Sequence, residues 1–174
     1  MALVLDGTNG VTFPVTAGSA SAVQASSGRV LQVVSTTYST AVLNTTSTLA
    51  DTNLTATITP SSATSKILVL ISQYIYIVSG INSANANTGL VDTQRNGTSI
   101  FQTDNILGIK AQAPSGDVNQ IFWYLPIFYL DSPATTSATT YKTQMALSTT
   151  GGTNKITAQY NNKPSTITLM EIAA

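Results

Sequence analysis

Apolar and polar residues alternate along much of this chain with a period of two, which is typical of β-strands. In residues 54–59 the apolar Leu54, Ala56 and Ile58 alternate with threonines, and Pro60 ends the run. Asn96-Gly97 lies between the runs 90–95 and 98–102 and is the strongest hairpin signal in the chain. Further runs follow over 30–34, 66–78, 119–130, 139–147, 155–160 and 165–172, so we expect about eight strands.

No helical periodicity competes with this pattern, and the sequence therefore predicts an all-β protein. We expect an antiparallel β-sandwich, jelly-roll-like, with an eight-stranded barrel as the alternative. Residues 15–27, VTAGSASAVQASS, are small and polar without lasting periodicity, which is typical of a flexible tether. The prediction is an extended N-terminal anchoring arm and tether over 1–28 and an oligomerisation domain over 29–174.

Residues 121–130 are apolar on both faces of the predicted strand. One face carries Ile121, Trp123, Leu125, Ile127 and Tyr129, and the other carries Phe122, Tyr124, Pro126, Phe128 and Leu130. A strand in a two-layer sandwich normally buries one face, so the second face needs another partner. That partner is either a covering loop or a second subunit, and we favour the subunit. Pro126 cannot donate a ladder hydrogen bond, which predicts an edge or a bulge there.

The runs 67–78 and 166–172 are two-faced in the same way, and near-zero net charge also favours self-association. A cyclic trimer or dimer follows, and the pattern alone does not choose between them. The residues that we predict at this oligomer interface are Trp123, Tyr124, Phe128, Ile167, Leu169, Met170 and Ile172.

Composition excludes several kinds of chemistry. The chain has no His and no Cys, which excludes Ser-His-Asp and Cys-His catalysis, disulfides and zinc-thiolate sites. Its aspartates fall mostly in turns or at strand ends, where Asp occurs for backbone reasons, so no credible carboxylate pair stands out. The segments DGTNG (6–10) and DTQRNG (92–97) lack the spacing of a calcium loop. We therefore expect no catalytic residue, no metal site and no cofactor, and hence no enzyme.

Charge and hydropathy also limit the partners. Seven basic and seven acidic residues are spread along the chain, so no electrostatic footprint for nucleic acid is present. The longest apolar run is too short for a spanning helix, and we expect no membrane insertion. The N-terminus lacks the basic and long apolar regions of a signal peptide, so we expect it to stay on the mature protein.

Both ends of the chain resemble virion structural proteins of tailed bacteriophages. The opening LVLDGTNGVTFP (3–14) resembles the N-terminal segment of tail-fibre and other virion proteins, particularly in phages of marine and freshwater bacteria. Three later stretches are similar to a recurring β-domain of phage fibre or decoration proteins: TATITPSSATSKILVLIS (55–72), YLDSPATTSATTYKTQ (129–144) and STITLMEIAA (165–174). These pieces span most of the chain, and the last is the most specific.

The resemblance implies a β-rich, usually trimeric and non-catalytic module on the virion surface, made in the host cytoplasm. It also implies that the opening segment anchors the module, by strand addition and apolar insertion into the phage particle or a sister subunit. The predicted virion-anchoring residues are Leu3, Val4, Leu5, Asp6, Gly7, Thr8, Asn9, Gly10, Val11, Thr12, Phe13 and Pro14.

Three functions remain open at this stage. The first is a homotrimeric capsid decoration or cement protein, whose partners are itself and phage capsid proteins. The second is a short tail fibre or receptor-binding protein, which attaches to host surface glycans through loops such as Gly80–Gly89 and Leu107–Asp117. The third is a carbohydrate-active enzyme on a jelly roll, which the missing histidine and carboxylate pair disfavour. The short tether favours the first function over the second.

Overall fold

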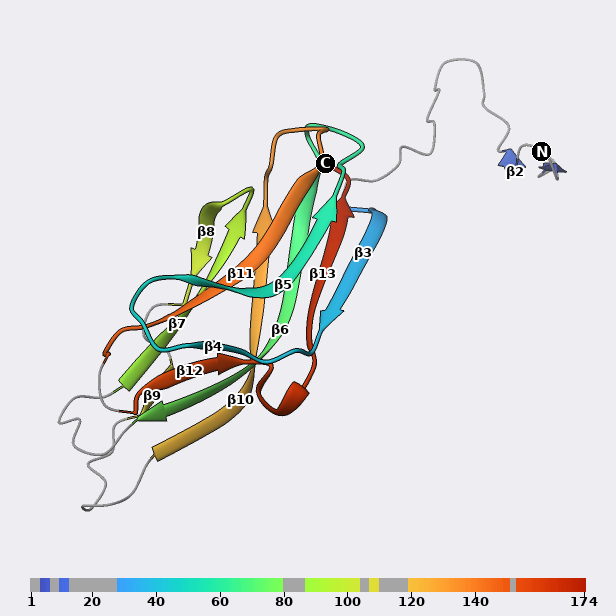
Figure 1. Ribbon diagram of the computed structural model, residues 1–174. Helices are drawn as coiled ribbons and strands as arrows, with labels where there is room; N and C mark the ends of the chain where they lie inside the picture. The colour runs from blue at the N-terminus through green and yellow to red at the C-terminus, as the bar shows by residue number, and fades with distance from the viewer. Residues whose placement is uncertain are drawn as a thin grey trace.

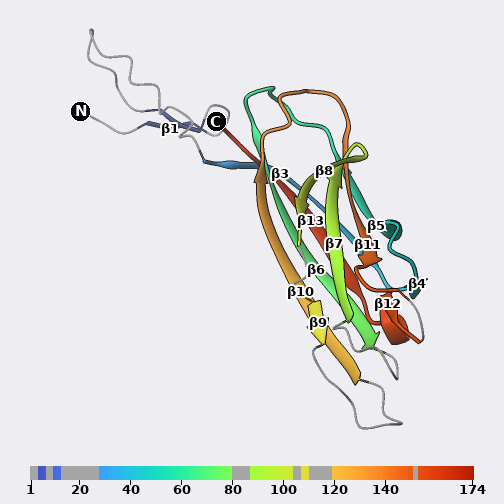
Figure 2. The same cartoon turned by 90° about the vertical axis from the view of Figure 1, so that its left-hand side faces the viewer.

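The computed structural model describes residues 4–6, 10–12, 28–79, 87–103, 107–109, 119–150 and 153–174. Within this part of the chain, two antiparallel sheets pack face to face as a β-sandwich (Figure 1 and Figure 2). The predicted fold class is therefore confirmed. The sheets hold six and five strands, more than the eight expected, partly because two three-residue strands give no readable alternation.

One layer, the β6 sheet, is built around the longest strand of the molecule. Its members are β3 (Val30–Tyr38), β13 (Ser165–Ile172), β6 (Lys66–Ser79), β12 (Lys155–Ala158), β4 (Val42–Asn44) and β10 (Asn119–Asp131). One side of β6 pairs without a break with β10, from Ile67 opposite Asp131 to Ser79 opposite Asn119. Its other side pairs first with β13 and then with β12. The second layer, the β11 sheet, holds β5 (Ala50–Ile58), β11 (Thr139–Leu147), β7 (Asn87–Arg95), β8 (Thr98–Gln102) and β9 (Leu107–Ile109).

Several strand boundaries agree closely with those predicted from the sequence pattern. Strands β11 and β13 begin and end at the predicted residues, and β6 and β10 each extend one residue further. The predicted hairpin between β7 and β8 is confirmed, since Asn96 and Gly97 have φ values of 49° and 84°, as a tight hairpin turn requires. The strand expected over 155–160 instead ends at Ala158, because Gln159 takes a left-handed φ of 52°.

Between β12 and β13 the chain leaves the ladder in a short 3-10 turn, η1 (Tyr160–Asn162). The backbone groups of β6 still form hydrogen bonds where the ladder is interrupted between β12 and β13. The Gln159 N–H donates to the Tyr74 carbonyl at 2.9 Å, and the Tyr74 N–H donates to the Ser165 hydroxyl, also at 2.9 Å. A side-chain oxygen thus replaces a missing ladder acceptor.

The N-terminal segment is described only in part. Strands β1 (Val4–Asp6) and β2 (Gly10–Thr12) pair antiparallel, with Leu5 opposite Val11. The other predicted anchoring residues, Leu3, Gly7, Thr8, Asn9, Phe13 and Pro14, lie outside the described residues. The division at residue 28 stays a prediction.

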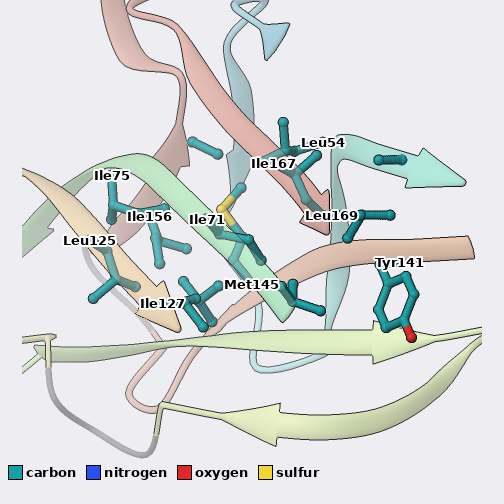
Figure 3. Close-up of a cluster of buried hydrophobic side chains, with 14 of the residues drawn as sticks. Leu54, Ile71, Ile75, Leu125, Ile127, Tyr141, Met145, Ile156, Ile167 and Leu169 are labelled. Atoms are coloured by element: carbon teal, nitrogen blue, oxygen red, sulfur yellow. The ribbon is translucent and has the colours of Figure 1, made fainter. Parts of the chain in front are cut away.

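The core fills the space between the two sheets. It is a cluster of buried aliphatic residues with Tyr141 and Met145, contributed by both layers (Figure 3). Leu54, Ile167 and Leu169 are among its fully buried members. Burial of such side chains is the main source of stability in a chain without disulfides.

A buried polar chain crosses this core and ties the layers together. The amide of Gln73 on β6 donates to the Ser165 hydroxyl at 3.0 Å and accepts from the Thr143 hydroxyl on β11 at 2.8 Å. The Thr143 hydroxyl also bonds the Thr52 hydroxyl on β5. Because an unpaired buried polar group is costly, the chain fixes how the two sheets are aligned.

A second link closes the sandwich where β10 ends. Arg95 of β7 donates from Nη1 to both carboxylate oxygens of Asp131, each at 2.9 Å. The Tyr141 hydroxyl of β11 donates to the same carboxylate at 2.7 Å. Burial, and then the neighbouring Asp131, raise the pKa of Tyr141 far above its ordinary value, so this hydroxyl stays a neutral donor.

Glu171 ties β13 to the turn that precedes β6. Its carboxylate is fully buried and accepts from the Ser61 N–H at 2.8 Å, the Ser61 hydroxyl at 2.6 Å and the Gln32 amide at 2.6 Å. Burial by itself raises the pKa of this carboxyl. The hydrogen bonds outweigh that effect and hold the pKa of Glu171 at about 2.

We expect Gln73→Leu to lower the free energy of unfolding by about 1–3 kcal/mol, because it removes both hydrogen bonds of the Gln73 amide from the core. Chemical denaturation followed by circular dichroism measures this. The neighbouring Ser72→Ala, on the outward side of the same strand, is the matched control and should shift stability by less than about 0.5 kcal/mol. An unchanged or raised midpoint for Gln73→Leu would contradict the linking role.

Acid should weaken the fold through Glu171. Its pKa is about 2 in the folded state against an ordinary 4.5, so its contribution is complete above pH 4.5 and is lost as the pH falls toward 2. A shift of this size corresponds to roughly 3 kcal/mol. Between neutral and acidic pH, the free energy of unfolding should therefore depend less steeply on pH for Glu171→Gln than for the unchanged chain. An equal pH dependence for both would show that Glu171 is not responsible.

Candidate interaction surface

The outer face of the β6 sheet is unusually apolar. Eight large apolar side chains are exposed in the described part of the chain, and all of them lie on strands of this sheet. Phe128 is the most exposed, at 69%. The set is Val30, Leu31 and Val33 of β3, Leu43 of β4, and Phe122, Tyr124, Phe128 and Leu130 of β10.

The strand register arranges the outer face in rows. At one end, the aliphatic end, Leu130, Leu68, Met170 and Val33 stand side by side across four strands. The middle rows are more polar, and there the hydroxyls of Ser35 and Thr168 bond each other at 2.9 Å. At the other end, the aromatic end, the register places Phe122, Tyr76, Thr157 and Leu43 in one row and Tyr124 beside Tyr74.

The aromatic end is a stacked cluster. The ring of Tyr76 stacks on both Phe122, with centroids 4.6 Å apart, and Tyr160, with centroids 4.1 Å apart, and the Phe122 and Tyr160 centroids are 5.8 Å apart. The Lys155 ammonium lies 5.7 Å from the centroid of the Tyr76 ring. Burial raises the pKa of Tyr76, and the nearby Tyr160 adds to the shift. Stacked aromatic pairs are worth about 0.5–1.5 kcal/mol beyond the area they bury, so this end of the face is well ordered.

Tyr160 is not among the residues predicted for this surface. Its position depends on the η1 turn, in which Gln159, Asn161 and Asn162 all have left-handed φ values. Asparagine tolerates that conformation better than most residues. The pair Asn161-Asn162 after Tyr160 is therefore the sequence feature from which this turn could be predicted.

A groove runs along the free side of β10. It has a volume of about 510 Å³ and is lined by residues 123–128 of β10 and by Phe101 and Thr103, beside the opposite layer. None of the described residues that line it is charged. Trp123, the only tryptophan of the chain, is half-buried here and packs against the core. β10 and β8, which carry most of the lining, are edge strands of their two sheets (Figure 2).

The outer face of the β11 sheet is polar by contrast. Asp51 accepts from the Lys142 ammonium and from the Gln144 amide, both at 2.7 Å. The network continues through Gln94 to Asp92, which also accepts from the Ser99 hydroxyl. The hydrogen bond from Lys142 is the main cause that lowers the pKa of Asp51. The polar side chains of this face hydrogen-bond to one another, whereas the outer face of the β6 sheet exposes large apolar side chains.

The structure separates the predicted interface residues into two groups. Tyr124, Phe128, Met170 and Ile172 lie on the outer face of the β6 sheet. Ile167 and Leu169 are fully buried between the sheets, and Trp123 also packs against the core. These three strand positions point inward, and Ile167 and Leu169 have no exposed surface in the single chain, so the structure places them on the inner side of the sheet and not on its outer face.

The described residues offer little metal or membrane chemistry. They contain no group of three or more Asp and Glu side chains placed to hold a metal ion. Among the same residues there is no helix with the length and apolar character needed to cross a membrane. The loops Gly80–Gly89 and Leu107–Asp117, named above as glycan-binding candidates, lie mostly outside the described part, which includes only 87–89 and 107–109 of them.

Comparison with known proteins identifies no family. No family model matches the sequence, and no curated protein matches it either. Among solved structures, the infectious bursal disease virus Gt strain matches over 100% of this chain with 16% identity and a TM-score of 0.35. The structure of the T13 viral particle of the same virus matches with 16% identity and a TM-score of 0.34. Dimeric latent PorU from Porphyromonas gingivalis matches over 86% of this chain with 10% identity and a TM-score of 0.30. This chain covers 42%, 40% and 14% of those chains, less than half of each. TM-scores this low establish neither family nor function.

Proposed function

We propose that this chain is a non-catalytic virion structural protein that self-associates through the outer face of the β6 sheet. The observation that carries the proposal is the segregation of all eight exposed large apolar side chains of the described residues onto that sheet. A gathering of exposed apolar side chains on one face is typical of interaction sites. The resemblance of residues 3–14 and 165–174 to phage virion proteins supplies the setting.

The apolar side chains are numerous enough to drive association. If each of the eight contributes roughly 1 kcal/mol when its exposed half is buried, one face supplies roughly 8 kcal/mol. Two copies supply about twice that, against an association cost of about 4–15 kcal/mol. The proposed interface consists of these eight side chains together with Met170 and Ile172, which lie on the same outer face.

The particular role that we propose is a homotrimeric capsid decoration or cement protein. In this role the N-terminal segment, residues 3–14, attaches the trimer to the particle. The weak contact of each arm is multiplied across three arms, which raises the avidity well above that of one contact. The short tether supports decoration, because a long fibre would interpose a shaft between anchor and domain.

A short tail fibre or receptor-binding protein is the second candidate. One feature favours it: the aromatic end of the outer face lies at the opposite end of β6 from the row of Val30, Ile172 and Lys66, near which the tether enters at Gly28. Exposed aromatic rings at the end remote from an anchor suit contact with host surface glycans. Cryo-electron microscopy of intact particles separates the two roles, since decoration places density on the capsid lattice and a fibre places it on the tail.

Phe128→Glu should dissociate the oligomer without unfolding the chain. Phe128 is 69% exposed in the single chain, so a charge there costs little until a second copy buries it. Thr57→Glu, on the exposed outer side of the β11 sheet, is the matched control. Light scattering should show a smaller mass for Phe128→Glu alone, with unchanged circular dichroism. An assembly of unchanged mass would contradict the proposed interface.

Deletion of residues 1–14 should leave a folded oligomer that no longer binds particles. We expect this because the deletion removes the anchoring segment and none of the sandwich strands. Co-sedimentation of the tagged full-length and deleted forms with particles that are only partly depleted of the native protein measures the loss. The Phe128→Glu variant, which keeps its arm, should bind more weakly because it loses avidity rather than the anchor. Full binding by the deleted form would remove the anchoring role.

A further inference from the structure

The free edge of β10 is a place where a further strand fits. Within the described residues β10 pairs only with β6, so its other edge presents backbone groups without a ladder partner (Figure 2). Such edges are templates for strand addition. The groove lined by residues 123–128, Phe101 and Thr103 lies along this edge, so the side chains of an added strand would contact apolar residues there.

Pro126 limits what this edge accepts. It is part of an unbroken register with β6, and it has no N–H to offer. A long added strand would lose a hydrogen bond there, whereas a short strand can pair with the residues on one side of Pro126 only. The N-terminal strands β1 and β2 are three residues each, which suits the length available on either side.

The N-terminal segment is followed by enough chain to reach a groove on a neighbouring copy, and its composition suits that groove. Fifteen residues separate Thr12 from Gly28, which is enough chain to span about 50 Å. The Gly28 N–H bonds the Ala173 carbonyl next to the end of β13, at the same end of the β6 sheet as the Asp131 end of β10. Residues 3–14 carry one charge, Asp6, and an uncharged groove favours such a segment. In the single chain, β1 and β2 pair with each other and not with β10.

We infer that the groove along β10 receives the N-terminal segment, residues 3–14, of a neighbouring copy. This rests on the proposed function and names the partner of the anchor: a second copy of this chain that already belongs to the particle. Attachment is then lateral, from copy to copy, through short strand addition beside Pro126. The outer face of the β6 sheet and the groove serve two contacts, and Tyr124 and Phe128 belong to both.

Disulfide trapping tests this directly, because the chain contains no cysteine. Full-length Thr12→Cys and a size-tagged full-length Pro126→Cys are purified separately, mixed and oxidised. A disulfide needs Cα atoms within about 7 Å, so only a docked segment should give the heterodimer on a non-reducing gel. The matched control pairs Thr12→Cys with Thr57→Cys, which is exposed on the outer side of the β11 sheet and lies outside both the groove and the proposed interface. We expect at least about fivefold more heterodimer for Pro126→Cys than for Thr57→Cys.

Two further readouts fix the outcome. The emission of Trp123 should shift to shorter wavelength as the full-length protein is concentrated, and the double variant Leu5→Asp, Val11→Asp should abolish that shift. Equal heterodimer for both cysteine positions would overturn the inference. So would a Thr12→Cys, Pro126→Cys chain that closes an internal disulfide at high dilution, since the segment would then occupy its own groove. These results leave the particle location untouched, whereas absence of the protein from particles would defeat the proposed function itself.

Discussion

Two long paired strands, each apolar on both faces, determine where the core and the exposed apolar face of this structure lie. Strands β6 and β10 pair over the whole of β10, and their inward side chains, among them Ile71 and Ile127, build the core. The same pairing forces Phe122, Phe128 and Leu130 onto the outside. A two-layer sandwich buries one face of each sheet, so this chain keeps a second apolar face that its own layers do not cover.

The two layers are therefore unequal, and the interior is arranged to hold them in one alignment. The β11 sheet presents hydrogen-bonded Asp51, Gln94 and Gln144 outward, whereas the β6 sheet presents phenylalanine and leucine. Gln73 and the Arg95–Asp131 pair cross from one layer to the other through buried polar contacts. These links fix the alignment of the sheet that carries the apolar face, and a preorganised face loses less conformational entropy on binding.

The sequence predicted the strands better than the surface. Alternation and the Asn96-Gly97 turn are local signals, so β11, β13 and the β7–β8 hairpin could be placed from them. Alternation alone does not say which face points inward. That depends on register with β6, and for this reason Ile167 and Leu169 were expected at an interface but lie in the core. Tyr160 and Leu43 join the face through a left-handed turn and a three-residue strand, where no period can be read.

Hydroxyl-radical footprinting of the full-length protein, dilute and assembled, tests the central claim most directly. If the outer face of the β6 sheet is the assembly surface, Phe122, Tyr124 and Phe128 should be oxidised readily when dilute and be protected in the assembled state. Tyr38, half-buried at the end of β3, should react equally in both. Equal oxidation of the three β10 aromatics in dilute and assembled protein would show that the apolar face stays open to solvent, and would contradict the account.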